Sequence, residues 1–360
     1  MSCRFPRLRA CGRTWPCLVL SLLMLGADAP PRGYVATRAA RPITVDGKLD
    51  DPAWAEAAWT DDFVDIEGSK KPNPRFRTRV KMLWDDQFFY VAADMVEPHV
   101  WATITQHDAV IFHDNDFEVF IDPDGDHHEY FELEINAQDA EWDLFLPKPY
   151  RDGGSADNGW EIPGLKAKAH VDGTLNDPTD TDRGWSVELA IPWASMAEKA
   201  RTATPPRDGD QWRVNFSRVE WEHTLDGKTY QKVPKRPEAN WVWSPQGTIN
   251  MHRPERWGYV QFSSAKPGAA TFRPDPSGPA RDLLMQVYEA QKTYHAQHKA
   301  WAPTLEALGR TDLKGTGGGE RPSLRLDDQG YQAEVTITNP SGTPQVWRLR
   351  HDSRISWKSN

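Results

Sequence analysis

Short segments in which polar and apolar residues alternate, many of them with tryptophan, fill most of the chain. This pattern limits the fold classes that the chain can adopt. Thirteen of the 17 Trp lie in residues 34–263. In residues 75–84, four cationic side chains alternate with a face that carries Phe76, Val80, Met82 and Trp84. Apolar residues at every second position predict a strand with one buried face and one solvated face.

The same pattern recurs at short intervals. We predict further strands over residues 88–93, 116–122, 130–136, 142–146, 166–171, 185–191, 212–219 and 257–262. Asp-Gly pairs at 124–125, 172–173 and 208–209 mark turns between them. Many short strands joined by turns indicate a mainly β protein with an antiparallel β-sandwich. Large rings fill the space between two sheets, so we expect five of the Trp in the core: Trp54, Trp84, Trp185, Trp193 and Trp212.

The chain changes character after the sandwich, which we assign to residues 34–263. Residues 264–279 are rich in Pro, Ala, Gly and Ser and are predicted to form a linker. Residues 281–300 have an apolar stripe of helical period, and residues 331–338 and 345–350 alternate as strands. We therefore predict a small C-terminal α+β appendage over residues 280–360.

The N-terminus resembles an export signal. A basic segment is followed by an apolar stretch at residues 15–25 that is too short to span a bilayer, and then by Ala27-Asp28-Ala29. We predict a signal peptide over residues 1–29 and an exported protein, either periplasmic or extracellular. All three Cys lie in this segment, so we expect neither disulfides nor a thiolate metal site in the exported chain.

Charge limits the partners that we expect. Removal of residues 1–29, which hold four Arg and one Asp, would change the formal net charge from −9 to −12. An acidic surface repels nucleic acid and anionic membranes. No second apolar stretch is long enough to span a bilayer. We expect a monomer without a membrane span, whose surface suits neutral ligands and cations such as Ca²⁺.

Five motifs follow one another in order along the predicted sandwich. They are ITVDGKLDDPAW at 43–54, VKMLWDDQFFYV at 80–91, NDFEVFID at 115–122, GWSVELAIPW at 184–193 and PERWG at 254–258. The series resembles carbohydrate-binding module family 9, whose β-sandwich is related to DOMON domains. The resemblance implies binding of an oligo- or polysaccharide, association with polysaccharide catabolism, and bound calcium.

The resemblance also implies which residues hold the sugar. In the family, two aromatic rings sandwich a pyranose, and alignment puts the first at Phe112 and the second near Met251. Methionine is a smaller and softer platform, so Trp243 is a candidate to replace it. Glu118 matches a ligand-contacting Glu of the family, and His252 falls in its terminal binding loop.

Alternation over residues 130–136 adds polar candidates. It turns the odd-numbered apolar residues to the core and places Glu132, Glu134 and Asn136 on the opposite face with Tyr130. These groups could bond sugar hydroxyls, or they could form a solvated strand face. The predicted sugar site consists of Phe112, Glu118, Glu132, Asn136, Trp243, Met251 and His252. Tyr150 and Trp160 are candidates for a lid over it.

A possible calcium loop lies nearby. Asp122, Asp124 and Asp126 place three carboxylates around a predicted hairpin, and Ca²⁺ takes several hard oxygen ligands. An ordinary Asp-Gly hairpin turn is the alternative. We expect His127 and His128, in the same loop, to be exposed.

The function predicted from these features is non-catalytic carbohydrate binding. Two alternatives stay open. A haem-binding DOMON-type electron carrier could use Met251, His252 or His113 as iron ligands. A glycoside hydrolase component would hydrolyse O-glycosyl bonds with paired carboxylates. No Gly-x-Ser-x-Gly, His-Glu-x-x-His or phosphate-loop motif occurs in the chain.

Overall fold

The computed structural model describes residues 30–200, 202–314, 321–339 and 341–359. The predicted signal peptide, residues 1–29, lies outside the described residues. In the part of the chain that is described, no helix has the length and apolar character needed to cross a membrane.

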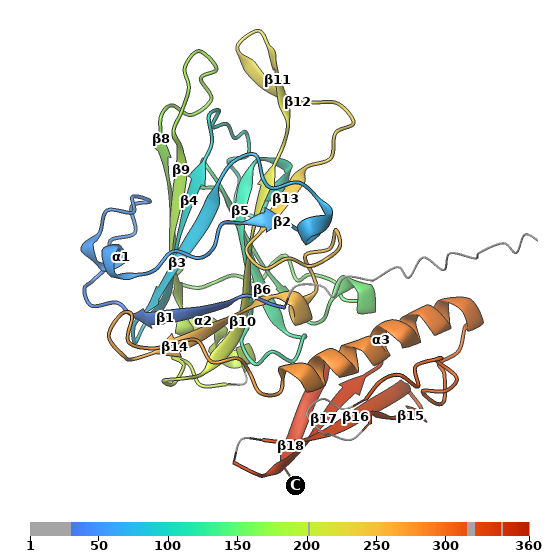
Figure 1. The fold of residues 1–360 in the computed structure, drawn as a ribbon. Coiled ribbons are helices and arrows are strands. Elements are labelled where there is room, and N and C mark those ends of the chain that lie inside the picture. The colour runs from blue at the N-terminus through green and yellow to red at the C-terminus, as the bar shows by residue number, and fades with distance from the viewer. Residues whose placement is uncertain (1–29, 201, 315–320, 340, 360) are drawn as a thin grey trace, which may run out of the picture.

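A twelve-stranded sheet that curls into two facing layers forms the main body (Figure 1). Its strands are β1 (Gly33–Arg38), β2 (Val64–Asp65), β3 (Thr78–Trp84), β4 (Phe88–Val96), β5 (Asp116–Asp122), β6 (Tyr130–Asn136), β7 (Glu141–Leu146), β8 (Lys166–Asp172), β9 (Gly184–Pro192), β10 (Gln211–Glu220), β13 (Ala239–Val242) and β14 (Gly258–Ser263). The strand order is β7-β6-β5-β10-β14-β1-β3-β4-β9-β8, with β13 paired to β10 and β2. All pairings in this sheet are antiparallel except those of β1 with β14 and β3.

The predicted mainly β sandwich is therefore confirmed. The remaining elements of this body are short: α1 (Pro52–Glu56), α2 (Trp193–Ala200), the 3-10 turns η1 (Gly68–Lys70), η2 (Ile111–His113), η3 (Tyr150–Asp152) and η4 (Pro254–Arg256), and the hairpin β11 (His223–Asp226) with β12 (Thr229–Lys232). That hairpin extends beyond the end of the sandwich (Figure 1).

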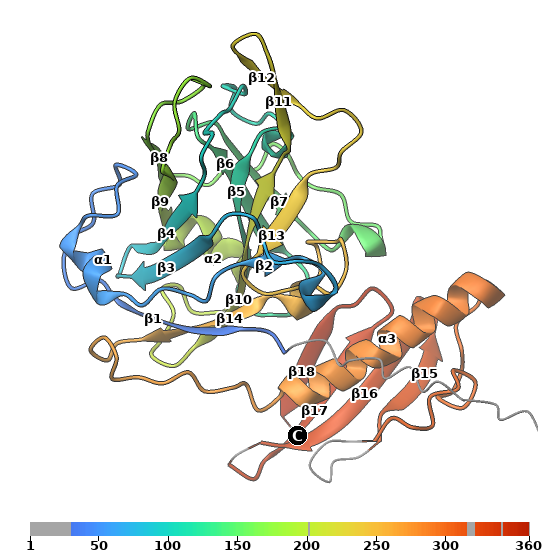
Figure 2. The same cartoon turned by 45° about the horizontal axis from the view of Figure 1, so that its top comes forward.

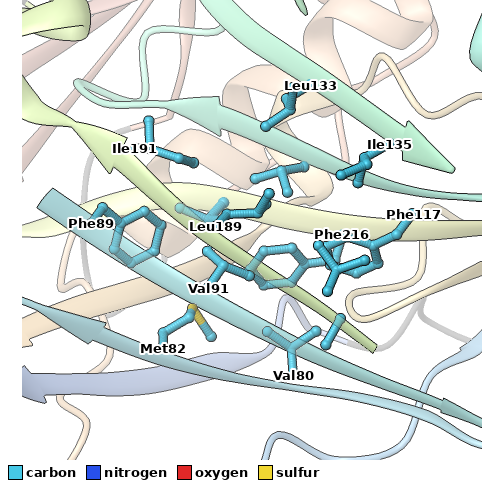
Figure 3. Close-up of a cluster of buried hydrophobic side chains, with 14 of the residues drawn as sticks. Val80, Met82, Phe89, Val91, Phe117, Leu133, Ile135, Leu189, Ile191 and Phe216 are labelled. Carbon is cyan, nitrogen blue, oxygen red and sulfur yellow. The ribbon is translucent and has the colours of Figure 1, made fainter. Parts of the chain in front are cut away.

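Alternate side chains of the two layers meet in the core (Figure 3). Val80, Met82, Phe89, Val91, Leu189 and Ile191 come from β3, β4 and β9, and Phe117, Leu133, Ile135 and Phe216 come from β5, β6 and β10. The five Trp expected in the core are each at most 3 % exposed, which confirms that prediction. Trp54 lies in a smaller cluster with Leu83 and Tyr90 on the outer side of β3 and β4.

The C-terminal unit packs one helix on a small sheet (Figure 2). Helix α3 (Gly278–His298) covers the antiparallel strands β15 (Ser323–Asp327), β16 (Gly330–Thr338), β17 (Pro344–Arg350) and β18 (Ile355–Ser359). A proline fits the first turn of the helix, and Lys299 ends the helix in the left-handed conformation. The apolar stripe of α3, with Leu284 and Val287, packs against Trp347 and Leu349.

Asp152 in η3 joins this unit to the sandwich. Its carboxylate accepts hydrogen bonds from the Tyr288 hydroxyl at 2.6 Å, the Lys292 ammonium at 3.1 Å and the Ser353 hydroxyl at 2.7 Å. Charged donors strengthen hydrogen bonds of this kind. The C-terminal unit is therefore anchored at the same short turn that carries Tyr150.

Gly258 gives a direct test of the packing between sandwich layers. A Cβ at this position would lie 2.3 Å from the buried ring of Trp243. We predict that Gly258→Ala lowers the free energy of unfolding by about 1–3 kcal/mol, because the ring must move in a filled core. Urea unfolding followed by tryptophan fluorescence measures this change.

Gly278→Ala is the matched control, because a Cβ there meets no atom within 4 Å. It should change stability by less than about 1 kcal/mol. Equal effects of the two substitutions would contradict the packing described for Trp243.

Candidate functional site

A cleft of about 390 Å³ lies on the outer face of β5, β6 and β10. It exists because the strands alternate: Phe117 and Val119 of β5 enter the core, and Glu118 and Phe120 face out. Residues of β6 and β7, and of the segments that carry Phe112 and Met251, complete the lining. The residues that line the cleft are Ile66, Phe112, Glu118, Phe120, Glu132, Glu134, Trp142, Leu144, Tyr150, Val219, Glu238, Asn240, Ile249, Asn250, Met251 and His252.

Two aromatic rings form one wall. The rings of Phe112 and Trp142 are stacked, with centroids 6.5 Å apart and planes inclined by 29°. The backbone of Phe112 is fixed on both sides: its N–H donates to Glu134 Oε2 at 2.9 Å, and its carbonyl accepts from Trp221 Nε1 at 2.9 Å. The wall is thus held in place by hydrogen bonds as well as by ring contacts.

A second wall is built around His252. Its Nδ1 lies 3.0 Å from the Tyr130 hydroxyl, and the Tyr150 ring meets the imidazole edge to face at 4.5 Å. Trp257 Nε1 donates to the carbonyl of Met251 at 2.8 Å, which fixes the preceding residue. Burial lowers the pKa of His252 to about 4. The imidazole is therefore neutral at physiological pH.

The floor is acidic and buried. Glu118, Glu132 and Glu134 are 6 %, 5 % and 2 % exposed, and Glu118 stands directly opposite Glu134 in the β5–β6 register. Burial raises the pKa of Glu118 to about 7. Burial and mutual repulsion raise the pKa of Glu132 and Glu134 well above the usual range of glutamate. Among the described residues, Glu132 Oε2 has no hydrogen-bond partner.

Five residues of the predicted sugar site come together in this cleft: Phe112, Glu118, Glu132, Met251 and His252. Two others do not reach it. Trp243 is 1 % exposed and belongs to the core, so it offers no face to a ligand. Asn136 is fully buried. Its amide nitrogen donates to the Ile104 carbonyl and the Asp114 carboxylate, and its oxygen accepts from backbone N–H groups of the following turn.

Several lining residues were not in the predicted set. Trp142 lies on the same face as Glu134, its partner in the β6–β7 register, but the register was not deducible from the strand alone. Asn240 belongs to β13, a strand that was not predicted. Of the two candidate lid residues, Tyr150 lines the cleft and is 47 % exposed. Trp160 instead packs on Phe131 beside the core.

Only two of the three candidate haem ligands line the cleft. Met251 and His252 both line the cleft. His113 is exposed, with its ring against that of Phe112 at 4.9 Å.

A calcium site needs several oxygen ligands close together, and the loop that carries Asp122, Asp124 and Asp126 provides three carboxylates. Each offers a carboxylate oxygen within 4.8 Å of the others, which suits the ion by atom type and spacing. Positive charge from the C-terminal unit already reaches the loop, because Arg354 pairs with Asp126 at 2.7 Å and Arg281 donates to the carbonyl of Gly125. Calcium binding at this loop stays a prediction.

The expectation that His127 and His128 are exposed is wrong. They are 0 % and 4 % exposed, because the C-terminal unit covers them. His127 Nδ1 lies 3.0 Å from the carbonyl of Ser353, and His128 Nε2 lies 2.7 Å from that of Asp352.

Comparisons with known proteins give a consistent assignment. A family model described as carbohydrate family 9 binding domain-like matches residues 45–262. The exoglucanase XynX of Acetivibrio thermocellus is 27% identical over 164 residues, which make up 45% of this chain and 12% of that enzyme. This chain therefore matches only a small part of that relative's length.

Solved structures are also similar. A family 9 carbohydrate-binding module from Caldicellulosiruptor kristjanssonii, in complex with cellotriose, has 16% sequence identity and a TM-score of 0.43. The same module in complex with glucose has 16% identity and a TM-score of 0.44. Each alignment covers 68% of this chain and 100% of the module.

The acidic floor predicts how stability depends on pH. The pKa of Glu118 is about 7 in the folded protein and near 4.5 in the unfolded chain. Between these values the folded state binds more protons at Glu118, so the contribution of this residue to the free energy of unfolding falls as pH rises from about 4.5 to about 7. Glu118→Gln is neutral throughout. We predict that it raises the melting temperature at pH 8, by roughly 2–4 °C for each kcal/mol recovered.

Thermal unfolding between pH 4 and pH 8 provides the measurement, and Glu56→Gln, at an exposed position in α1, is the control. The control should follow the wild-type pH profile. A lower melting temperature for Glu118→Gln at pH 8 would contradict the electrostatics assigned to the floor.

Proposed function

The chain belongs to the carbohydrate family 9 binding domain-like family, and on this premise we propose that the cleft over β5, β6 and β10 binds a sugar. Binding is expected at one end of an oligo- or polysaccharide or to a single sugar ring, because the cleft holds about 390 Å³. A concave site with a few convergent polar groups is the usual form of a small-ligand site.

One observation carries the proposal: a stacked aromatic wall stands beside a buried carboxylate that lacks a partner. A pyranose has an apolar C–H face and a rim of hydroxyls. The face can pack on Phe112 and Trp142, and a hydroxyl can donate to Glu132 Oε2. A buried acceptor without a donor is costly, so a ligand that supplies one gains free energy from it.

Binding is better supported than hydrolysis. A glycosidase needs one protonated carboxyl group as an acid and a second, ionised carboxylate as a base or nucleophile. Glu118, Glu132 and Glu134 all lie on the floor formed by β5 and β6, with Glu118 directly opposite Glu134 in the register, so they do not face one another across the cleft. We infer a non-catalytic role, and reducing-sugar release by the pure protein would contradict it.

The exported setting is part of the same proposal. The relative with the aligned segment is an exoglucanase, and the N-terminal segment has the basic and apolar regions of a signal peptide. We infer that the protein acts outside the cytoplasm, in the uptake or breakdown of a polysaccharide.

Removal of the aromatic wall tests the site. We predict that Trp142→Ala weakens binding of a sugar at least about tenfold, or roughly 1.4 kcal/mol, because the C–H face loses its platform. Isothermal titration against glucose, cello-oligosaccharides and xylo-oligosaccharides measures this effect, with the melting temperature recorded for each variant.

Trp357→Ala supplies the matched control, because Trp357 is 50 % exposed on β18 of the C-terminal unit. The affinity of the Trp357→Ala variant for sugars should equal that of the wild type. If no sugar of a broad panel binds, or if both substitutions have the same effect, the cleft is not the sugar site.

A further inference from the structure

The Asp, Glu, Lys and Arg side chains that line the cleft are all acidic. Glu118, Glu132, Glu134 and Glu238 line it, and among the lining residues that the structure describes there is no Lys or Arg. His252 is neutral at physiological pH, because burial lowers its pKa to about 4. The lining therefore presents carboxyl groups, and no cationic side chain, to an ionic ligand.

The neighbouring cations are engaged elsewhere. Arg151 forms a two-pronged ion pair with Glu255, at 2.7 Å and 2.8 Å. Lys232 Nζ lies 3.5 Å from the centre of the Trp221 ring, behind the wall that carries Phe112. Neither side chain lines the cleft.

Three buried glutamates elsewhere in the sandwich are paired with arginine. Glu97 and Glu220 both bond Arg218, at 2.7 Å and 2.9 Å. Burial alone would raise the pKa of Glu255, and its pair with Arg151 lowers that pKa well below the usual range instead. Glu97, Glu220 and Glu255 are thus each paired with a guanidinium group.

The cleft floor departs from that pattern. Glu132 is 95 % buried, lines the cleft and has an Oε2 atom without a partner in the described part of the chain. Asp116, fully buried next to Glu118 and Glu134, also has an unpartnered oxygen. Burial favours the protonated form of such a carboxyl group, as the raised pKa of Glu132 shows, and an ammonium group bound beside it would favour the ionised form and displace the proton.

We propose that the cleft selects an amino sugar, a pyranose with a free protonated amine such as glucosamine or an end of its oligomers. This inference rests on the proposed sugar-binding function. The ammonium would donate to Glu132 Oε2, and the stacked rings of Phe112 and Trp142 would receive the sugar face and attract the adjacent positive charge. N-acetylation would remove that charge, and a uronic acid would bring a carboxylate against the acidic floor.

Glucose and three sugars that each differ from it at one carbon test the proposal. Isothermal titration of the full chain at pH 6.5, where an amine is protonated, compares glucosamine, glucose, N-acetylglucosamine and glucuronic acid. EDTA is present throughout, so that divalent ions do not contribute. We expect glucosamine to bind at least about tenfold more tightly than glucose or N-acetylglucosamine, and glucuronic acid to bind most weakly.

Glu132→Gln keeps the shape of the side chain and prevents it from ionising beside the ammonium. It should weaken glucosamine binding more than glucose binding, so that the affinity ratio falls to within about twofold. Glu56→Gln, remote in α1, should keep the wild-type ratio.

The two proposals fail in different ways. If glucose binds as tightly as glucosamine, the sugar site stands and the amino-sugar inference is overturned. If the preference for glucosamine disappears when Ca²⁺ replaces EDTA, the floor binds the metal in place of the ammonium, and the inference is also overturned. If none of the four sugars binds, both proposals fail.

Discussion

The alternation of side chains along β5 and β6 is the constraint on which both the core and the cleft depend. Each strand sends one set of residues, including Phe117 and Leu133, between the layers and the other set, including Glu118 and Glu132, to the outer face. Because the period is two, a shift of one residue would exchange the sets. The core that fixes the register therefore also places the carboxylates side by side.

The C-terminal unit braces the cleft, although it lies outside the matched family region. Asp152 accepts three hydrogen bonds from side chains of the C-terminal unit, and it shares the turn η3 with Tyr150. Arg151 of the same turn pairs with Glu255 in η4, which follows the segment of Met251 and His252. The wall of the cleft around His252 is thus held by the same contacts that dock the C-terminal unit.

The sequence was most informative where the evidence is local. Alternation places β5 and β6 at residues 116–122 and 130–136, the observed bounds, and it puts Glu118 and Glu132 on the outer face. It was least informative where distant segments meet. Asn136 does lie on the predicted face, but the turn after β6 and the Ile104 carbonyl use its hydrogen-bonding capacity. Trp243 faces the core because it follows Trp241 by two residues, and both rings point the same way.

A crystal structure with a bound monosaccharide would show whether the cleft is the sugar site. We expect one sugar ring over the β5–β6 face, with its C–H face on Phe112 and Trp142 and a polar substituent within hydrogen-bond distance of Glu132 Oε2. A sugar bound at another surface, with the floor carboxylates out of contact, would contradict this assignment.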